Sequence, residues 1–154
     1  MHRLFEITFL LCVCALTTTT VHGQMKNPLM GAWKVTEIAD PGKPPLTNPQ
    51  AGLYIFTEKH YSFARLNGTK PLPMYPSNEV ATDAEKVEVF NTLYVNTGSY
   101  TISGNVLNTS LMVAKSGWAL APGRIVDYDF AVNGNMLTLV LKRSGAVLKL
   151  VRVE

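Results

Sequence analysis

The chain has 154 residues, and its 14 Lys and Arg against 11 Asp and Glu give a formal net charge of +3. This length corresponds to one domain and is sufficient to bury an apolar core. The basic side chains are scattered, with only Lys142 and Arg143 adjacent, whereas a nucleic-acid-binding surface carries a clustered basic stripe. We therefore expect no nucleic-acid partner.

Residues 1–23 have the composition of a secretory signal peptide. Met1-His2-Arg3 is a short basic start, the run from Leu4 to Leu16 is mostly apolar, and Val21-His22-Gly23 precedes a suitable cleavage point. A membrane-spanning helix needs ~20 apolar residues, so an uncleaved anchor is the weaker alternative. The leader predicts a secreted protein, extracellular or periplasmic, with no membrane span after cleavage.

Both cysteines of the chain, Cys12 and Cys14, lie in this leader. A lipidated cysteine is an alternative, although Leu11 and Val13 are poor residues just before one. The domain predicted for residues 24–154 has neither disulfides nor thiol chemistry available. Its apolar core must therefore hold it together.

Residues with period-two alternation begin at Gly31, so that Trp33, Val35 and Glu37 share one face of a strand. The proline-rich segment 41–49 then predicts a long, stiff loop. Two further apolar strands follow, joined by a short turn that is typical of a hairpin; they span residues 53–57 and 60–65.

One helix is predicted after a second proline-rich loop. Thr82 and Glu85 fit a capping box, in which each side chain satisfies a free backbone amide of the other residue. Apolar side chains follow at helical spacing, namely Val87, Phe90 and Tyr94. The pattern predicts a helix of about 83–95 that lies across an opening or a side of the remaining structure.

The rest of the chain reads as strands separated by turns rich in glycine and asparagine. Asn133-Gly134-Asn135 is the strongest hairpin signal of the chain. The predicted strands span residues 99–102, 106–113, 124–132, 136–142 and 146–153. Eight antiparallel strands are close to the number at which a closed barrel holds side chains or one small ligand. The sequence thus predicts a mainly β fold, an eight-stranded antiparallel barrel with one internal helix, monomeric or weakly dimeric.

The order of these features resembles the lipocalin-like domain proteins of the calycin group. The resemblance is carried by Gly31-Ala32-Trp33, by the first hairpin, by the helix, by the segment Gly98 to Ile102 and by the final hairpins. In the lipocalin pattern a basic residue of the last strand covers the first-strand tryptophan, and Arg152 is the best match. Cation–π packing of arginine on an indole gives a physical reason for such a pair.

Two features separate this chain from typical secreted lipocalins, which usually carry disulfides and a helix after the barrel. The domain predicted here has no cysteine and an internal helix, so it is similar to the cysteine-free lipocalin-like group. That group includes proteins of unknown role and a few biosynthetic isomerases or cyclases. The resemblance therefore implies a fold but no particular ligand.

Alternation places several polar side chains on the inner face of the predicted barrel. Asp127 and Asp129 are expected to face water, so Arg124 and Tyr128 are predicted to point inward. By the same argument Tyr61, Phe63 and Arg65 share a face, and Glu37 lies on the face of Trp33. A few polar groups in an apolar cavity are typical of small-molecule sites. The alternative is that Glu37 only neutralises an arginine, since buried charges need partners.

Trp118 lies in a predicted loop, where an indole can cap a cavity or pack beneath the loop. The candidate ligand-binding residues are therefore Glu37, Tyr61, Phe63, Arg65, Trp118, Arg124 and Tyr128. No cofactor or metal site is expected, because His60 is the one histidine left after cleavage and no phosphate-binding glycine motif occurs. Asn67 and Asn108 are glycosylation acceptors only in a eukaryotic secretory route.

The predicted function is the secreted binding of a small hydrophobic or amphipathic molecule, with its polar or anionic end at Arg65 or Arg124. A cofactor-free isomerase or cyclase is the alternative, with Glu37, Tyr128 or His60 as acid or base. A third possibility is a structural module whose interior is filled, with Phe63, Phe130 and Met112 as the packing residues.

Overall fold

The structure of the protein is a computed structural model that describes residues 27–77, 79–122 and 124–154. The leader predicted for residues 1–23 lies outside the described residues. None of the helices in those ranges is both long and apolar enough to cross a membrane.

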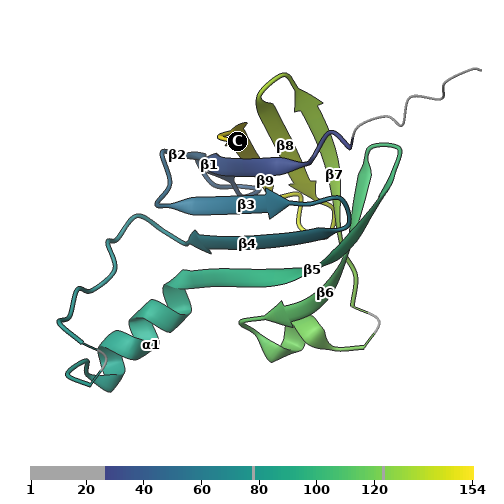
Figure 1. Cartoon of the computed structure of the whole chain (residues 1–154). Coiled ribbons are helices and arrows are strands. Elements are labelled where there is room, and N and C mark those ends of the chain that lie inside the picture. Colours follow the sequence, from purple (N-terminus) through teal and green to yellow (C-terminus); the bar gives the residue numbers. More distant parts are fainter. Residues whose placement is uncertain (1–26, 78, 123) are drawn as a thin grey trace, which may run out of the picture.

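A single antiparallel sheet closes on itself to form a barrel (Figure 1). Each strand pairs with the next along the chain, except that β3 pairs with β1 past the two-residue β2, and β9 pairs back with β1. Eight strands make the barrel, as predicted, and β2 adds a short edge to β1. The strands are β1 (Gly31–Ala39), β2 (Leu46–Thr47), β3 (Gly52–Phe56), β4 (His60–Leu66), β5 (Leu93–Ser103), β6 (Val106–Ala114), β7 (Val126–Asn133), β8 (Met136–Leu141) and β9 (Val147–Arg152).

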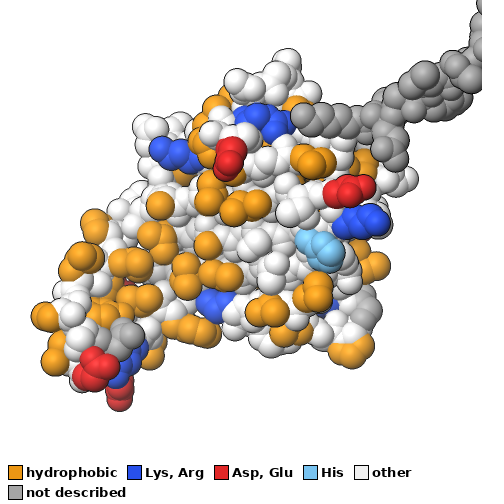
Figure 2. All heavy atoms as spheres, in the orientation of Figure 1, with side chains coloured by type: hydrophobic (Ala, Val, Ile, Leu, Met, Phe, Trp, Pro, Cys, Tyr) orange, Lys and Arg blue, Asp and Glu red, His pale blue; other side chains and the backbone are white. Residues whose placement is uncertain are grey.

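The helix α1 (Asp83–Thr92) begins at the predicted capping box, since the Thr82 side chain accepts from the amide of Glu85 and the Glu85 carboxylate accepts from that of Thr82. It ends three residues before the predicted position, because Leu93 is already extended and begins β5. The helix buries none of its residues. It lies beyond one end of the barrel, where Figure 2 shows hydrophobic side chains on the surface.

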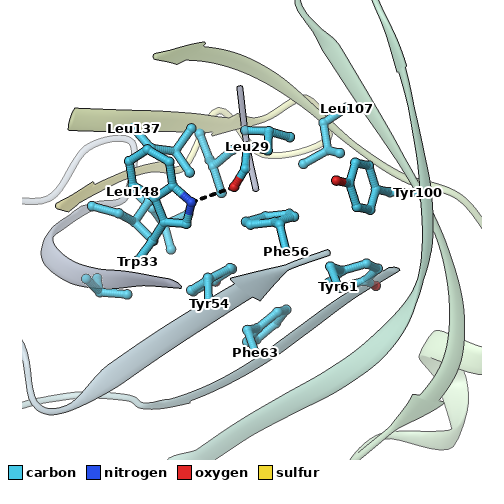
Figure 3. Close-up of a cluster of buried hydrophobic side chains, with 13 residues drawn as sticks. Leu29, Trp33, Tyr54, Phe56, Tyr61, Phe63, Tyr100, Leu107, Leu137 and Leu148 are labelled. Carbon is cyan, nitrogen blue, oxygen red and sulfur yellow. Dashed lines mark hydrogen bonds between the residues drawn. The ribbon is translucent and has the colours of Figure 1, made fainter. Parts of the chain in front are cut away.

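Trp33 lies near the opposite end of the barrel, and Figure 3 shows its indole packed among the buried side chains and directed at Leu29. Its side chain is fully buried, and its indole Nε1 donates to the carbonyl of Leu29 at 2.7 Å. Arg152 is the partner of Trp33 in the β1–β9 pair, and its guanidinium carbon lies 4.0 Å from the centroid of the indole. The arginine expected from the lipocalin pattern therefore covers the tryptophan.

Aromatic and leucine side chains continue the core from this tryptophan into the barrel. The Tyr54 and Phe63 rings stack with centroids 4.4 Å apart, and Tyr100 packs edge-on against Phe56. The buried cluster consists of Leu29, Trp33, Val35, Tyr54, Phe56, Tyr61, Phe63, Tyr100, Leu107, Leu137, Leu139, Leu148 and Leu150. Phe130 packs partly against this cluster, whereas Met112 is 65% exposed and does not fill the interior.

Candidate functional site

A cavity of about 420 Å³ occupies the end of the barrel away from Trp33. Its walls come from the ends of β1, β3, β4, β5, β6, β7, β8 and β9, together with the end of α1 and the short 3-10 helix η1 (Gly117–Leu120). Tyr54, Phe63 and Leu148 belong both to the core and to the cavity lining. The cavity therefore rests directly on the packed core, and most of its lining is apolar or aromatic.

Arg65 on β4 is a cationic side chain of the cavity lining, and Lys115 at the mouth is another. Arg65 Nη1 donates to Asn67 Oδ1 at 2.5 Å, and its guanidinium carbon lies 4.8 Å from the centroid of the Tyr94 ring. Its Nε is buried and has no hydrogen-bond partner among the described residues. The Arg65 side chain lines the cavity, where its guanidinium also interacts with the Tyr54 hydroxyl.

Asn96 lies on β5, the strand that pairs with the strand of Arg65, and it also lines the cavity. Its register partner on β4 is Phe63, which faces the interior, so Asn96 faces inward as well. Its Oδ1 is buried without a hydrogen-bond partner within the described ranges. Two neighbouring strands thus place two polar side chains, Arg65 and Asn96, in a largely apolar wall.

The hydroxyls of two cavity tyrosines stay protonated at neutral pH. Burial raises the pKa of Tyr54 to about 12, although the neighbouring Arg65 guanidinium partly offsets this effect. Burial also raises the pKa of Tyr128, with smaller contributions from Tyr54 and Tyr61. Neutral phenols offer hydrogen-bond donors to a ligand rather than a base.

The structure brings four of the seven predicted site residues together around this cavity. Phe63, Arg65, Trp118 and Tyr128 line it. Tyr61 points inward as predicted, but it lies deeper in the core and does not reach the lining.

Glu37 does not belong to the cavity, and the inward position predicted for it is wrong. A register shift between Val35 and Glu37 adds a residue to β1, so strict alternation from Trp33 fails beyond it. Ile38 then packs against the core, while Glu37 pairs with Lys149, whose Nζ lies 2.9 Å from its carboxylate. The buried neighbours of Lys149 are Leu148 and Leu150, so this ion pair lies on the outer face.

Arg124 does not point into the barrel either, because β7 begins only at Val126. The Arg124 amide donates to the carbonyl of Ala121 in a turn, so the alternation of the strand does not extend to it. Its guanidinium carbon lies 4.6 Å from the centroid of the Trp118 ring. The indole separates Arg124 from the cavity, since Trp118 lines the cavity and Arg124 does not.

Sequence reasoning missed Tyr54, Tyr94 and Asn96 as cavity residues. The helix predicted for about 83–95 includes Tyr94 and stops just before Asn96, whereas β5 begins at Leu93. A predicted strand that began at Leu93 would have put Tyr94 and Asn96 on the same face as Tyr100, because the three are separated by even numbers of positions. Tyr100 is buried. Tyr54 lies in an almost wholly apolar strand, in which composition does not distinguish the two faces.

The residues predicted for acid or base catalysis are scattered. Glu37 lies on the outer face, His60 is exposed at the start of β4, and Tyr128 alone of the three lines the cavity. Within the described ranges no group of three or more His, Cys, Asp or Glu could hold a metal ion.

A second, more open depression of about 760 Å³ lies at the Trp33 end, with Asn27, Tyr100 and Phe130 in its lining. None of the predicted site residues lines it. The cavity at the other end is therefore the stronger candidate for a ligand site.

Two solved structures are similar to this chain. One is a lipocalin-like protein from Bacteroides uniformis, with 12% identity, a TM-score of 0.50 and coverage of 82% of this chain and 99% of that one. The other is an uncharacterized protein from Bacteroides eggerthii, with 10% identity, a TM-score of 0.50 and coverage of 80% and 98%. No protein family and no curated protein matches the sequence. The closed barrel and these two likenesses establish that the chain has a lipocalin-like fold.

Proposed function

We propose that this barrel binds a small, mostly apolar molecule whose polar or anionic end meets Arg65. The observation that carries the proposal is the Arg65 side chain in the largely apolar and aromatic lining of a cavity of about 420 Å³. This volume lies within the ~300–1,000 Å³ typical of small-molecule pockets. Aromatic and aliphatic walls supply affinity through burial, and a few polar groups fix the orientation of the ligand.

The polar groups of the cavity favour an anionic or hydrogen-bond-accepting head group. Arg65 supplies a positive charge inside the barrel, and the neutral Tyr54 and Tyr128 hydroxyls supply further donors. Lys115, the other cationic residue of the lining, donates to the carbonyl of Phe90. Arg124, the other arginine expected at the head group, packs on Trp118 outside the cavity and is not part of this proposal.

Secretion belongs to the same proposal and is supported by the composition of residues 1–23. A secreted binding protein then acts by carrying or sequestering its ligand outside the cytoplasm.

The test compares two dyes that share one aromatic skeleton. Anilinonaphthalene sulfonate carries an anionic group, and phenylnaphthylamine does not. Arg65→Gln is expected to weaken the sulfonate by ~1.5–3 kcal/mol, roughly ten- to a hundredfold, because a charge-assisted contact is lost. Its effect on the uncharged dye should be small. Fluorescence titration measures both affinities.

Arg124→Gln is the matched control, since it removes the same charge outside the cavity. Equal losses of sulfonate affinity in Arg65→Gln and Arg124→Gln would contradict the proposed head-group site. Native mass spectrometry of the protein from its own source then identifies any co-purifying ligand.

A further inference from the structure

We propose that the open end of the barrel docks onto a lipid surface that carries anionic head groups. This inference does not depend on a ligand in the cavity. It rests on two features of the mouth, which are an uncovered apolar rim and a surplus of cationic side chains near Trp118.

The apolar rim consists of side chains from α1, η1 and the segment that follows η1. Val87 and Phe90 of α1 are each 56% exposed, Trp118 is 58% exposed, and Ile125 is 66% exposed. Phe90 and Trp118 also line the cavity, so the rim surrounds its mouth. Figure 2 shows the part of this surface formed by the α1 end, where hydrophobic side chains are gathered.

The helix is the part of the rim that most needs a covering surface. It has ten residues and buries none of them against the barrel. A helix this short is marginally stable in water by itself, and helices in proteins are stabilised mainly by packing of an apolar face. Val87 and Phe90, three positions apart, are therefore the apolar side chains that α1 can offer to a partner.

Three cationic side chains stand beside this rim. Lys115 Nζ lies 4.7 Å from the centroid of the Phe90 ring, and Arg124 and Arg143 lie 4.6 and 5.8 Å from that of Trp118. Aromatic side chains flanked by Lys and Arg are typical of segments that lie in a membrane interface.

Near Trp118, the acidic groups do not cancel these cations. Asp40 pairs with Lys43, and Glu88 pairs with Lys70. Asp127 shares an outer hollow with Arg124 and Arg143 and is the one acidic side chain in its lining. The positive surplus is therefore local to the Trp118 side of the mouth, because α1 carries Asp83, Glu85 and Glu88 against Lys86. The Trp118 side complements an anionic lipid surface and opposes the docking of a second copy on the same rim.

The test uses the emission of Trp118 in the full chain mixed with vesicles. Trp33 is fully buried and gives a constant background. Vesicles of phosphatidylcholine with phosphatidylglycerol are expected to shift the Trp118 emission to the blue, and brominated lipid should quench it. This local signal separates docking of the mouth from lipid binding by the apolar leader. Trp118→Phe should abolish the shift.

Substitutions then locate the surface. Arg124→Gln and Arg143→Gln should each weaken the vesicle titration on the order of fivefold at low salt, and added salt should weaken the original protein as well. Phe90→Ser should weaken it by a similar factor. Ile55→Ser is the matched control, because Ile55 is 44% exposed on the outer face of β3 and should leave the titration unchanged.

Several results would overturn the proposal. An unshifted Trp118 emission would remove the docking surface, and an equal shift with phosphatidylcholine alone would remove its preference for anionic lipid. A titration weakened as much by Ile55→Ser as by Phe90→Ser would place the contact elsewhere. A dimer in sedimentation that Phe90→Ser dissociates would assign the rim to a second copy of the chain.

Discussion

Arg152 lies over the indole of Trp33 at 4.0 Å and donates through the same guanidinium to the carbonyls of Met30 and Pro28. One side chain thus joins the last strand, the first strand and the segment that precedes it. The closed end depends on this group, because the barrel is completed only where β9 pairs with β1.

Arg152→Met should lower the free energy of unfolding by about 3 kcal/mol, because it removes the cation–π contact and the charged donors together. Urea denaturation measures the change. Arg143→Met is the control, since Arg143 is exposed and lies 5.8 Å from its indole; its effect should be within ~0.5 kcal/mol. Equal effects of the two substitutions would contradict the role assigned to Arg152.

Gly31→Ala should destabilise the barrel by at least ~2 kcal/mol. Gly31 has a φ of +123°, and a Cβ there would lie 2.4 Å from the carbonyl oxygen of Glu154. Gly117→Ala is the matched control, because a Cβ at Gly117 meets nothing within 4 Å. Thermal unfolding of the two variants should therefore differ by several degrees, and similar melting temperatures would contradict this prediction.

The cavity tyrosines predict a loss of stability at alkaline pH. The pKa of Tyr54 is about 12 in the folded protein, against ~10 in an unfolded chain. The folded state therefore holds its proton longer. The contribution of the Tyr54 hydroxyl to the free energy of unfolding is fully present below pH ~10. It declines as the pH rises from there through the folded-state pKa. Burial of Tyr128 acts in the same direction.

Tyr54→Phe should reduce this alkaline decline, because the group that must ionise on unfolding is absent. Melting temperatures between about pH 9 and 12 measure it. Tyr75→Phe, in the segment between β4 and α1, serves as the control substitution. An alkaline decline that Tyr54→Phe leaves unchanged would show that Tyr54 does not contribute.

Regular alternation was enough to predict the inner face where strands are regular. Tyr61, Phe63 and Arg65 share the inner face of β4, and Tyr128 follows the same rule on β7. The closed end was also predictable, because a lipocalin-like pattern connects Trp33 with a basic residue of the last strand.

The predictions for Glu37 and Arg124 were wrong because the position of each side chain depends on strand pairing with residues that are distant in the sequence. The bulge that turns Glu37 outward exists in the pairing of β1 with β9, more than 100 residues later, and the local sequence of β1 contains no signal for it. The start of β7 depends similarly on its pairing with β6, which begins at Val126 opposite Thr109. Arg124 lies before that point.

Glu37→Gln tests the outward position directly. The Glu37–Lys149 pair is partly exposed, with 23% and 45% of the two side chains accessible, so its loss should cost at most ~1 kcal/mol. Sulfonate dye affinity should stay unchanged. A marked loss of dye affinity would contradict the outward position and indicate that Glu37 contacts the ligand.

Substitution of Asn96 tests whether a polar side chain that lowers the stability of the ligand-free fold contributes to ligand binding. The buried Oδ1 of Asn96 has no hydrogen-bond partner in the part of the chain that the structure describes, and such an atom costs ~1–3 kcal/mol. Asn96→Leu keeps a similar volume without the polar atom, so it should raise the free energy of unfolding of the ligand-free protein by about 1 kcal/mol.

The same variant should bind the natural ligand more weakly if that ligand carries a donor for Oδ1, because functional sites retain groups that the empty fold would be more stable without. Thr97→Val, at the next position of β5, removes a hydroxyl that donates to the carbonyl of Tyr61 at 2.7 Å. It should destabilise the protein, because that carbonyl loses its side-chain donor. Opposite signs for the two neighbouring substitutions in urea denaturation would therefore separate a polar group kept for a ligand from one that stabilises the barrel.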